Sequence, residues 1–585
     1  MRVYNKDVVI PRPLAIAVLA LMLALALQAA PPIFPLKDVR AGQHGIGRTV
    51  FAGTKVEEFQ VEILGVLENI GPHESVILAR LKGGPLENTG VLQGMSGSPV
   101  YIDGKLAGAV ALAFPMSKEA IAGIRPIEEM LRVDPDPKPA PGTTLLARRT
   151  VRMSERAGNS AGNARLEEIA TPVSFSGFTA ATLEHFGPAL RELGLDPRQG
   201  VSGGGKPGEA LGDPKQLEAG SMISVELLTG DMNAGADGTV TCIDGDRIYA
   251  FGHRFLAGGP TELPFARSEV LALLPNVQAS FKISAAREWM GVITEDRNAA
   301  ISGRVGRRAV TIPIEIKVGA NTYRMGMIQD RVMTPLVTQM AVFSAIDATE
   351  RSTGPATYSV RGHLDFDGGS VRIDNAYGGD VATSTLAALG VGAPLSYALG
   401  AGFDQLKLKN VVLEIGAVER RHQTQIAEVA APRQVRPGED VELMISLAGE
   451  NGSAAIRTAH YRVPVGAPLG TLYFTVSDAT SANLQGLQAR AGMPLRSPAQ
   501  VFEVLNELRS NTKAYVRVWR AETAYTIEGR DLPNVPPSLA LILNRVETAT
   551  AMPLNLRGSK LAEIEIPVGD TVVTGSKTIQ VEVKE

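Results

Sequence analysis

Short runs of alternating apolar and polar residues, separated by Gly, Pro, Asn and Asp, recur along this chain and predict β-strands. Residues 41–132 contain several such runs. Within them, Asp103-Gly104 separates two apolar runs, which is typical of a tight hairpin because this turn needs positive φ values. A short helix is expected after Pro126. We therefore expect residues 41–132 to form one β-rich unit.

A second β-rich segment covers residues 166–325. Its clearest signal is a hairpin over residues 239–251, where two apolar runs flank an Asp-Gly-Asp turn. A helix is expected near residues 180–194. Residues 133–165 are rich in Pro, Arg and Ser without periodicity, which predicts a linker, and residues 197–219 read as a flexible insert.

The rest of the chain is expected to form a mixed helix and strand extension, 326–425, and a β-rich accessory region, 426–585. Thr334-Pro335 predicts the start of a helix, with Thr as the cap and Pro at the first helical position. Ser497–Gln500 has the pattern of a capping box and predicts a helix over residues 498–509.

The N-terminus has the pattern of an export signal. Arg2, Lys6 and Arg12 precede an apolar run over residues 13–27, which is shorter than the ~20 residues that a membrane-spanning helix needs. We expect residues 1–30 to be a signal peptide and the protein to reach the periplasm, the cell envelope or the medium. An uncleaved membrane anchor is the alternative.

Composition narrows the function classes. Of 585 residues, 58 are Lys or Arg and 61 are Asp or Glu, so a net charge of −3 gives no electrostatic signature of nucleic-acid binding. The single cysteine, Cys242, excludes an intramolecular disulfide and a cysteine-based zinc site. Its place in a strand favours a buried apolar role over a catalytic thiol. His363, Asp365 and Asp367 fit the polar face of a hairpin better than a metal site, and no cofactor is expected.

The segment Gly94-Met95-Ser96-Gly97-Ser98-Pro99 carries the first candidate chemistry. A nucleophilic serine needs a tight turn that exposes its hydroxyl and directs backbone amides at a developing oxyanion. In the serine-protease arrangement those amides belong to the serine and to the residue two before it, here Ser96 and Gly94. A Gly/Ser turn without catalytic role is the alternative.

A nucleophilic serine also needs a base. Of seven histidines, His253 follows a predicted strand and the small residue Gly252, a position from which a ring can turn into a cleft. A structural histidine at a strand end is the alternative.

These segments resemble the SpoIVB-type serine peptidase family. The similarity lies in two blocks: residues 53–59, 89–110 and 127–131 around the serine, and residues 238–241, 249–253, 280–282 and 303–306 around the histidine. The resemblance implies that Ser96 is the nucleophile and His253 the base. It also implies a trypsin-like double β-barrel, with a serine-bearing half over 41–132 and a histidine-bearing half over 166–325.

Two features depart from the family pattern. The serine block precedes the histidine block here, so the two halves are expected in permuted order. The family's aspartate falls near Lys82, which cannot accept a hydrogen bond from an imidazole. Glu74, Glu87, Glu262 and Asp244 are the candidates for its role, and the PDZ domain of the sporulation enzyme is not evident.

The sequence thus predicts an exported, mainly β serine endopeptidase that cleaves protein or peptide substrates through a Ser-His dyad or triad. It is expected to contact a membrane only through an uncleaved N-terminal segment, and its oligomeric state is not predicted. The rival interpretation is a pseudo-peptidase, a non-catalytic envelope protein that uses the same fold for binding.

Overall fold

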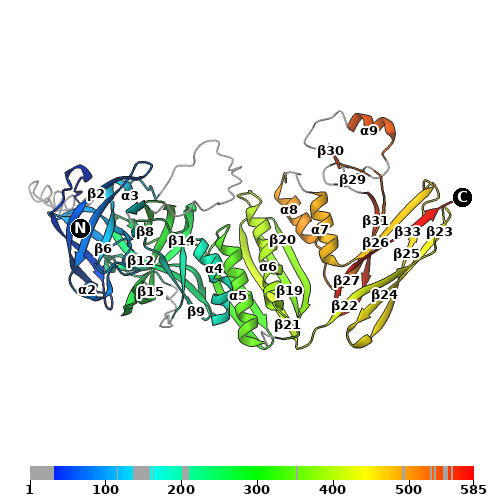
Figure 1. Cartoon of the computed structure of the whole chain (residues 1–585), viewed down its shortest axis with the longest axis horizontal. Helices are drawn as coiled ribbons and strands as arrows, with labels where there is room; N and C mark the ends of the chain where they lie inside the picture. Colours follow the sequence, from blue (N-terminus) through cyan, green and yellow to red (C-terminus); the bar gives the residue numbers. More distant parts are fainter. Residues whose placement is uncertain are drawn as a thin grey trace, which may run out of the picture. The chain divides into compact units, whose positions relative to one another are not determined.

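A computed structural model gives the architecture of the chain (Figure 1). The structure describes residues 32–114, 116–135, 159–161, 164–200, 210–277, 279–350, 354–490, 495–522, 524–527, 530–532, 535–543, 551–554 and 558–585. The expected signal peptide lies outside the described residues, as do 136–158 and 162–163 of the expected linker and 201–209 of the expected insert.

The chain forms two compact units. The first runs to Gly177 and resumes over Leu183–Val310, and the second comprises Phe178–Thr182 and Thr311–Glu585. Ser96 and His253 both belong to the first unit.

A six-strand barrel opens the first unit. The strands pair in the order β4-β1-β2-β3-β6-β5, and β4 also pairs with β5, which closes the ring. Phe59, Val61 and Ile63 alternate along β2 and point into the core. The strands are β1 (His44–Val50), β2 (Val56–Gly71), β3 (Glu74–Lys82), β4 (Pro99–Ile102), β5 (Lys105–Ala113) and β6 (Ile121–Pro126).

Local signals in this barrel are confirmed. Asp103 and Gly104 join β4 to β5 with φ values of 50° and 72°, as the hairpin pattern predicted. The helix after Pro126 is α3 (Ile127–Met130), and α2 (Leu86–Thr89) precedes the serine segment. β8 (Ala164–Glu168) pairs with β5 and with β7 (Asn159–Ala161), so strands begin inside the stretch expected to be a linker.

A second set of six strands also pairs as a ring, in the order β12-β13-β16-β15-β14-β11, because β11 pairs with β12. The predicted hairpin over residues 239–251 is the β12–β13 pair. These strands are β11 (Met222–Gly230), β12 (Asn233–Asp244), β13 (Arg247–Ala250), β14 (Gly259–Leu274), β15 (Phe281–Arg297) and β16 (Ala300–Val305). Beside β12 lie β9 (Thr171–Ser176) and β10 (Leu195–Gln199), with α4 (Ala180–Glu192) between them in sequence.

The second unit begins with a five-strand sheet and two apolar helices. The sheet order is β18-β17-β21-β19-β20, and α5 packs against α6. Asp330 Oδ1 accepts the amides of Val332 and Met333, so Asp330 caps α5 and the prediction of a Thr334 cap was wrong. The elements are β17 (Ile312–Val318), β18 (Asn321–Met327), α5 (Met333–Thr349), β19 (Ala356–Phe366), β20 (Gly369–Gly379), α6 (Thr383–Gly400) and β21 (Leu408–Val418).

The unit ends in two sheets that share one apolar core, which includes Val441, Phe474 and Val516. Their orders are β25-β24-β22-β32 and β23-β33-β26-β27-β31. The strands are β22 (Gln423–Ala430), β23 (Gln434–Val435), β24 (Asp440–Gly449), β25 (Ala454–Arg462), β26 (Gly470–Ser477), β27 (Lys513–Arg520), β31 (Ser559–Pro567), β32 (Val572–Thr574) and β33 (Ser576–Val583).

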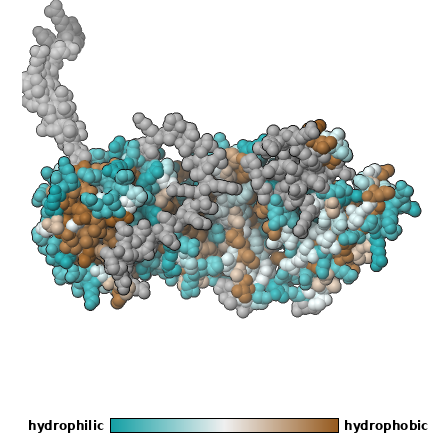
Figure 2. Space-filling model, turned by 45° about the horizontal axis from the view of Figure 1, so that its top comes forward, coloured by the Kyte–Doolittle hydropathy of each residue, from teal (hydrophilic) through white to brown (hydrophobic). Residues whose placement is uncertain are grey.

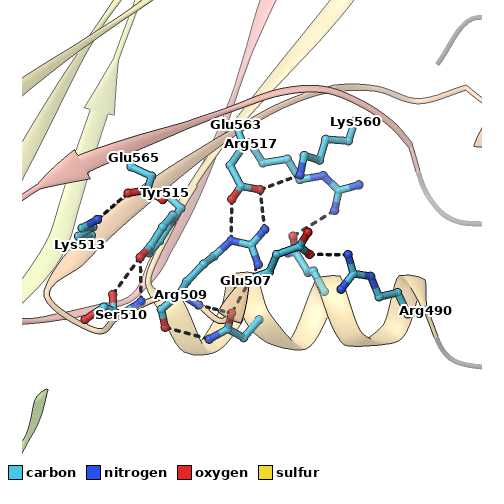
Figure 3. Close-up of polar contacts among 12 residues, drawn as sticks. Arg490, Glu507, Arg509, Ser510, Lys513, Tyr515, Arg517, Lys560, Glu563 and Glu565 are labelled. Atoms are coloured by element: carbon cyan, nitrogen blue, oxygen red, sulfur yellow. Dashed lines mark hydrogen bonds and ion pairs between the residues drawn. The ribbon is translucent and has the colours of Figure 1, made fainter. Parts of the chain in front are cut away.

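A polar network fixes two helices, α7 (Ala479–Ala489) and α8 (Pro498–Asn506), beside this sheet (Figure 3). Arg509 makes a bidentate ion pair with Glu563 at 2.6 and 2.7 Å, and Asn483 of α7 donates to the Arg509 carbonyl at 3.1 Å. Lys560 also pairs with Glu563, at 3.0 Å. These contacts join α7 and the segment after α8 to β31.

The smaller elements are η1 (Leu36–Asp38), η2 (Pro214–Gln216), η3 (Glu450–Gly452), β28 (Ala524–Ile527), β29 (Arg530–Leu532), β30 (Ala551–Leu554) and α9 (Pro537–Leu543). Figure 2 shows apolar side chains gathered on the surface of the first barrel, at the left of the view. Among the described residues no helix has the length and apolar character to cross a membrane. The prediction of a mainly β, barrel-containing fold is confirmed.

Candidate active site

Ser96 lies in a tight turn between α2 and β4. Gly94 and Gly97 flank it with φ values of 90° and 92°, which disfavour any residue but glycine. A methyl group on Gly97 would lie 2.0 Å from the Thr239 carbonyl oxygen. The Gly97 amide donates to Val110 O at 2.7 Å, and the Ser98 amide to Met95 O at 2.9 Å. The turn is therefore fixed against β5.

Strand β12 of the second ring holds the same turn from the other side. The Thr239 amide donates to Ser96 O at 2.8 Å, and Thr239 Oγ1 donates to Gly94 O at 2.9 Å. Thr241 Oγ1 donates to Gly97 O at 2.8 Å. The Thr-x-Thr pattern of the predicted hairpin thus binds the carbonyl groups of the serine turn, a role that the sequence analysis missed.

The amides in this turn divide into two classes. Those of Met95, Gly97 and Ser98 all donate to backbone carbonyls. Among the described residues we find no acceptor for the amides of Gly94 and Ser96. These are the two amides that the sequence predicts as an oxyanion hole.

His253 follows β13 in a segment of unusual backbone conformation. Phe251 and Gly252 have φ values of 68° and 70°. The His253 side chain is buried, and its Nδ1 lies 2.7 Å from the Arg254 carbonyl oxygen. Because a carbonyl oxygen only accepts, Nδ1 carries a proton and the neutral ring presents the Nε2 lone pair. That is the tautomer a general base needs.

The serine and histidine segments both lie against β5. A methyl group on Gly97 would lie 2.5 Å from the Phe251 amide nitrogen, and one on Gly252 would lie 3.4 Å from Val110 O, the acceptor of the Gly97 amide. Ser96 Oγ and His253 Nε2 are both buried and have no hydrogen-bond partner among the residues that the structure describes, so they do not bond to each other in this conformation.

Residues 23–131 match the family SpoIVB peptidase S55. The resemblance read from the sequence is therefore confirmed for the segment that carries Ser96. The matched segment does not contain His253, and no curated protein matches the chain.

The surroundings of His253 favour the neutral form of its ring. Burial lowers the pKa of His253, and the nearby cations Arg125 and Arg254 act in the same direction. Glu168 and the Arg254 carbonyl partly oppose this shift of the pKa. The ring is therefore neutral at pH 7 and able to take a proton.

The structure brings none of the four candidate acids into hydrogen-bond contact with His253. Glu74 pairs with Arg125 at 3.3 Å, and Glu262 accepts the Val310 amide at 3.1 Å. Glu87 is exposed on α2, and Asp244 ends β12. Since the Arg254 carbonyl occupies Nδ1, all four remain without an observed link to the ring.

Two other carboxylates lie closer to the histidine segment. Glu168 pairs with Arg254 Nε at 3.4 Å. Asp296, at the end of β15, is buried and accepts the amides of Phe255 and Leu256 at 2.8 and 2.5 Å. No local sequence signal identified either residue: Glu168 lies just after the expected linker, 133–165, and Asp296 is 43 positions from His253.

Further ionisable groups are buried on strands β11, β12 and β15 of the second ring. Lys282 packs against Gly94 and donates from Nζ to Thr49 Oγ1 at 2.8 Å, and burial lowers its pKa to about 7. Burial raises the pKa of Asp237 to about 6 and that of Glu226 to about 7. Ser284 donates to Asp237 at 2.6 Å. Of these groups, Lys282 is the one that contacts the serine turn.

Two other residues considered in the sequence take no part in this site. Cys242 is buried as expected, and burial raises the pKa of its thiol to about 12, which leaves little thiolate at neutral pH. His363 pairs with Asp365 at 3.3 Å on β19. In the part of the chain that the structure describes, no three His, Cys, Asp or Glu side chains gather as a metal site.

Proposed function

We propose that this protein is an exported serine endopeptidase of the SpoIVB S55 type that acts on protein or peptide substrates. One observation carries the proposal. Within the described ranges, the two amides that an oxyanion requires have no acceptor, while neighbouring amides and carbonyls of the serine turn are bonded. A turn with only a structural role has no reason to leave these two donors unpaired.

The mechanism follows from these positions. Ser96 Oγ attacks the scissile carbonyl as His253 Nε2 takes the hydroxyl proton. The Gly94 and Ser96 amides stabilise the oxyanion of the tetrahedral intermediate. His253 then gives its proton to the leaving amine, and the acyl-enzyme is hydrolysed by water in the same two steps, which return the proton to Ser96.

Catalysis requires a change from the conformation described above. The Ser96 side chain is 0% exposed and His253 1% exposed, and their mutual hydrogen bond is not formed. Substrate entry therefore requires an opening above the serine turn and rotation of the Ser96 hydroxyl toward Nε2. Hydrogen bonds between catalytic groups commonly tighten only when substrate is bound.

The proposed export rests on the cationic and apolar pattern of residues 1–30. The test is the N-terminal sequence of the protein recovered from the periplasm or medium of an expressing Gram-negative cell. A mature N-terminus near residue 31 supports export, whereas a full-length product in the cytoplasm contradicts it.

A pseudo-peptidase is the second candidate, and one observation favours it. In the part of the chain that the structure describes, no carboxylate touches His253 Nδ1, and loss of the orienting acid in a serine protease costs on the order of 10⁴ in turnover. On this alternative the two barrels bind a partner without cleaving it.

A fluorophosphonate probe separates the two candidates. Labelling of Ser96, located by peptide mass spectrometry, is expected in the full chain and is expected to be lost in Ser96→Ala and at least 100-fold slower in His253→Ala. Ser98→Ala is the matched control, because Ser98 is equally buried in the same turn. Absence of Ser96 labelling in the folded protein, after hours with excess probe, supports the pseudo-peptidase.

A further inference from the structure

The loop that follows His253 is held by one buried carboxylate. Asp296 Oδ1 accepts the Phe255 amide at 2.8 Å, and Oδ2 accepts the amides of Leu256 at 2.5 Å and Gly258 at 3.5 Å. The carboxylate is 1% exposed. Burying a carboxylate is costly unless its oxygens are hydrogen-bonded. The three amides therefore stabilise the buried Asp296 carboxylate, and the carboxylate fixes the backbone of the loop.

One of these amides belongs to the peptide group that touches the histidine. The Phe255 N–H and the Arg254 C=O are the two ends of a single planar unit. Its carbonyl lies 2.7 Å from His253 Nδ1, and its amide donates to Asp296. The order of contacts is therefore carboxylate, peptide N–H, peptide C=O and imidazole Nδ1–H.

We propose that Asp296 is the positioning residue of the site and replaces the acid of a triad by acting through the 254–255 peptide group. This inference rests on the proposed peptidase function. A carboxylate that accepts from the N–H of a peptide polarises the unit and strengthens its carbonyl as an acceptor. Asp296 thereby fixes His253 with Nδ1 protonated and leaves Nε2 free for the serine proton.

Glu168 is the competing carboxylate, and its geometry is different. It pairs with the Arg254 side chain at 3.4 Å and makes no hydrogen bond to the His253 ring. Glu168, Arg125 and Arg254 are the charges that act on the ring, and together they change its pKa without selecting which nitrogen carries the proton.

The experiment measures the tautomer of His253 directly. The full chain is labelled with ¹⁵N in its histidine rings, and His253→Ala identifies the His253 signals among the seven histidines. In the native protein we expect a protonated Nδ1 and an unprotonated Nε2. In Asp296→Asn, whose amide group cannot accept from all of these donors, we expect loss of the single tautomer and fluorophosphonate labelling about 10²-fold slower, the effect of a small misplacement in a site.

Two variants serve as controls. Glu295→Gln changes a carboxylate that is just as buried in the adjacent position but pairs with Arg297 at 2.6 Å, and we expect the native tautomer and labelling within threefold of native. Arg254→Ala removes the ion pair with Glu168 and keeps the peptide group. It should keep the tautomer and raise the pKa of His253, because a nearby cation is lost.

The outcomes are distinct. A single native tautomer in folded Asp296→Asn, or its loss in Arg254→Ala, overturns the proposal. If Asp296→Asn does not fold, Asp296→Glu is measured instead; it keeps two acceptor oxygens in a displaced position and should show the same change to a smaller degree. If the native protein never labels at Ser96 but the tautomer responds as expected, the positioning role stands and the peptidase function fails.

Discussion

The serine turn and the histidine loop both lie against β5, but different contacts hold them there. The serine turn is fixed by short-range geometry and by three hydrogen bonds from Thr239 and Thr241 of β12. In the histidine loop, the amides of Phe255 and Leu256 are accepted by one side chain, Asp296, near the end of β15. The first segment is therefore evident as a motif, whereas the second takes its conformation from a residue that is distant in sequence.

The largest effect is expected from Gly97→Ala, which disturbs the serine turn. The new methyl group would lie 2.0 Å from Thr239 O at a φ of 92°. Overpacking and backbone strain each cost about 1–3 kcal/mol, so we expect the free energy of unfolding to fall by about 2–6 kcal/mol and Ser96 labelling to vanish. Chemical denaturation measures the first quantity.

Gly104→Ala is the control for this substitution. Gly104 has a φ of 72° but no atom within 4 Å of an added methyl group, so only strain of about 1 kcal/mol is expected and labelling should persist. Equal losses in the two variants would show that contact with Thr239 does not matter.

Thr239→Val tests one of the hydrogen bonds from β12, and its expected loss of stability is smaller than that of Gly97→Ala. It leaves Gly94 O without its side-chain donor but keeps the Thr239 amide bond to Ser96 O. A buried acceptor without a donor costs about 1–3 kcal/mol. We expect slower Ser96 labelling as well, because the Gly94 carbonyl is no longer held by the side chain and Gly94 is the residue whose amide is proposed as one oxyanion donor.

Thr241→Val is the matched variant, since it removes the equivalent bond to Gly97 O. We expect a similar loss of stability with less effect on the labelling rate. A larger effect on labelling from Thr241→Val would contradict the assignment of Gly94 to the oxyanion hole.

The smallest effect is in the pH dependence, which reports on the histidine side. Burial lowers the pKa of His253 below its ordinary value of 6.5, so the acid limb of the labelling rate should lie below pH 6.5. The same shift makes the unfolded chain bind more protons than the folded one between the two pKa values. The stability contribution is therefore present above pH 6.5 and is lost as the pH falls through the folded pKa.

The control for this measurement is His253→Ala. The difference in stability between native protein and variant should shrink as the pH falls below 6.5. An acid limb above pH 6.5 would mean that the ring is not buried in the reactive conformation.

Local patterns allowed much of the fold to be predicted. The Asp103-Gly104 turn, the hairpin over 239–251 and the helix after Pro126 follow from residues that are adjacent in sequence. The cap of α5 was assigned wrongly because Asp330 lies outside the Thr-Pro pattern and reaches the helix through a loop.

The candidate site also contains residues that local sequence patterns predict and one residue, Asp296, that they do not. Ser96 and its amides are recognisable because glycines must flank such a turn, and His253 because it follows a strand and a glycine. The link from Asp296 through the 254–255 peptide requires β15 to pair with β14 and β16, and pairing between distant strands leaves no local mark in the sequence.

The hydrogen bonds from Thr239 and Thr241 to the serine turn determine which segments of the chain have to be kept together in evolution and in protein engineering. The segment that matches the family ends at residue 131, yet the donors that hold its serine turn begin more than a hundred positions later. A fragment ending there would keep the serine and lose the strand that orders it. The serine-bearing segment and the second ring of strands therefore have to be inherited, transplanted or redesigned together.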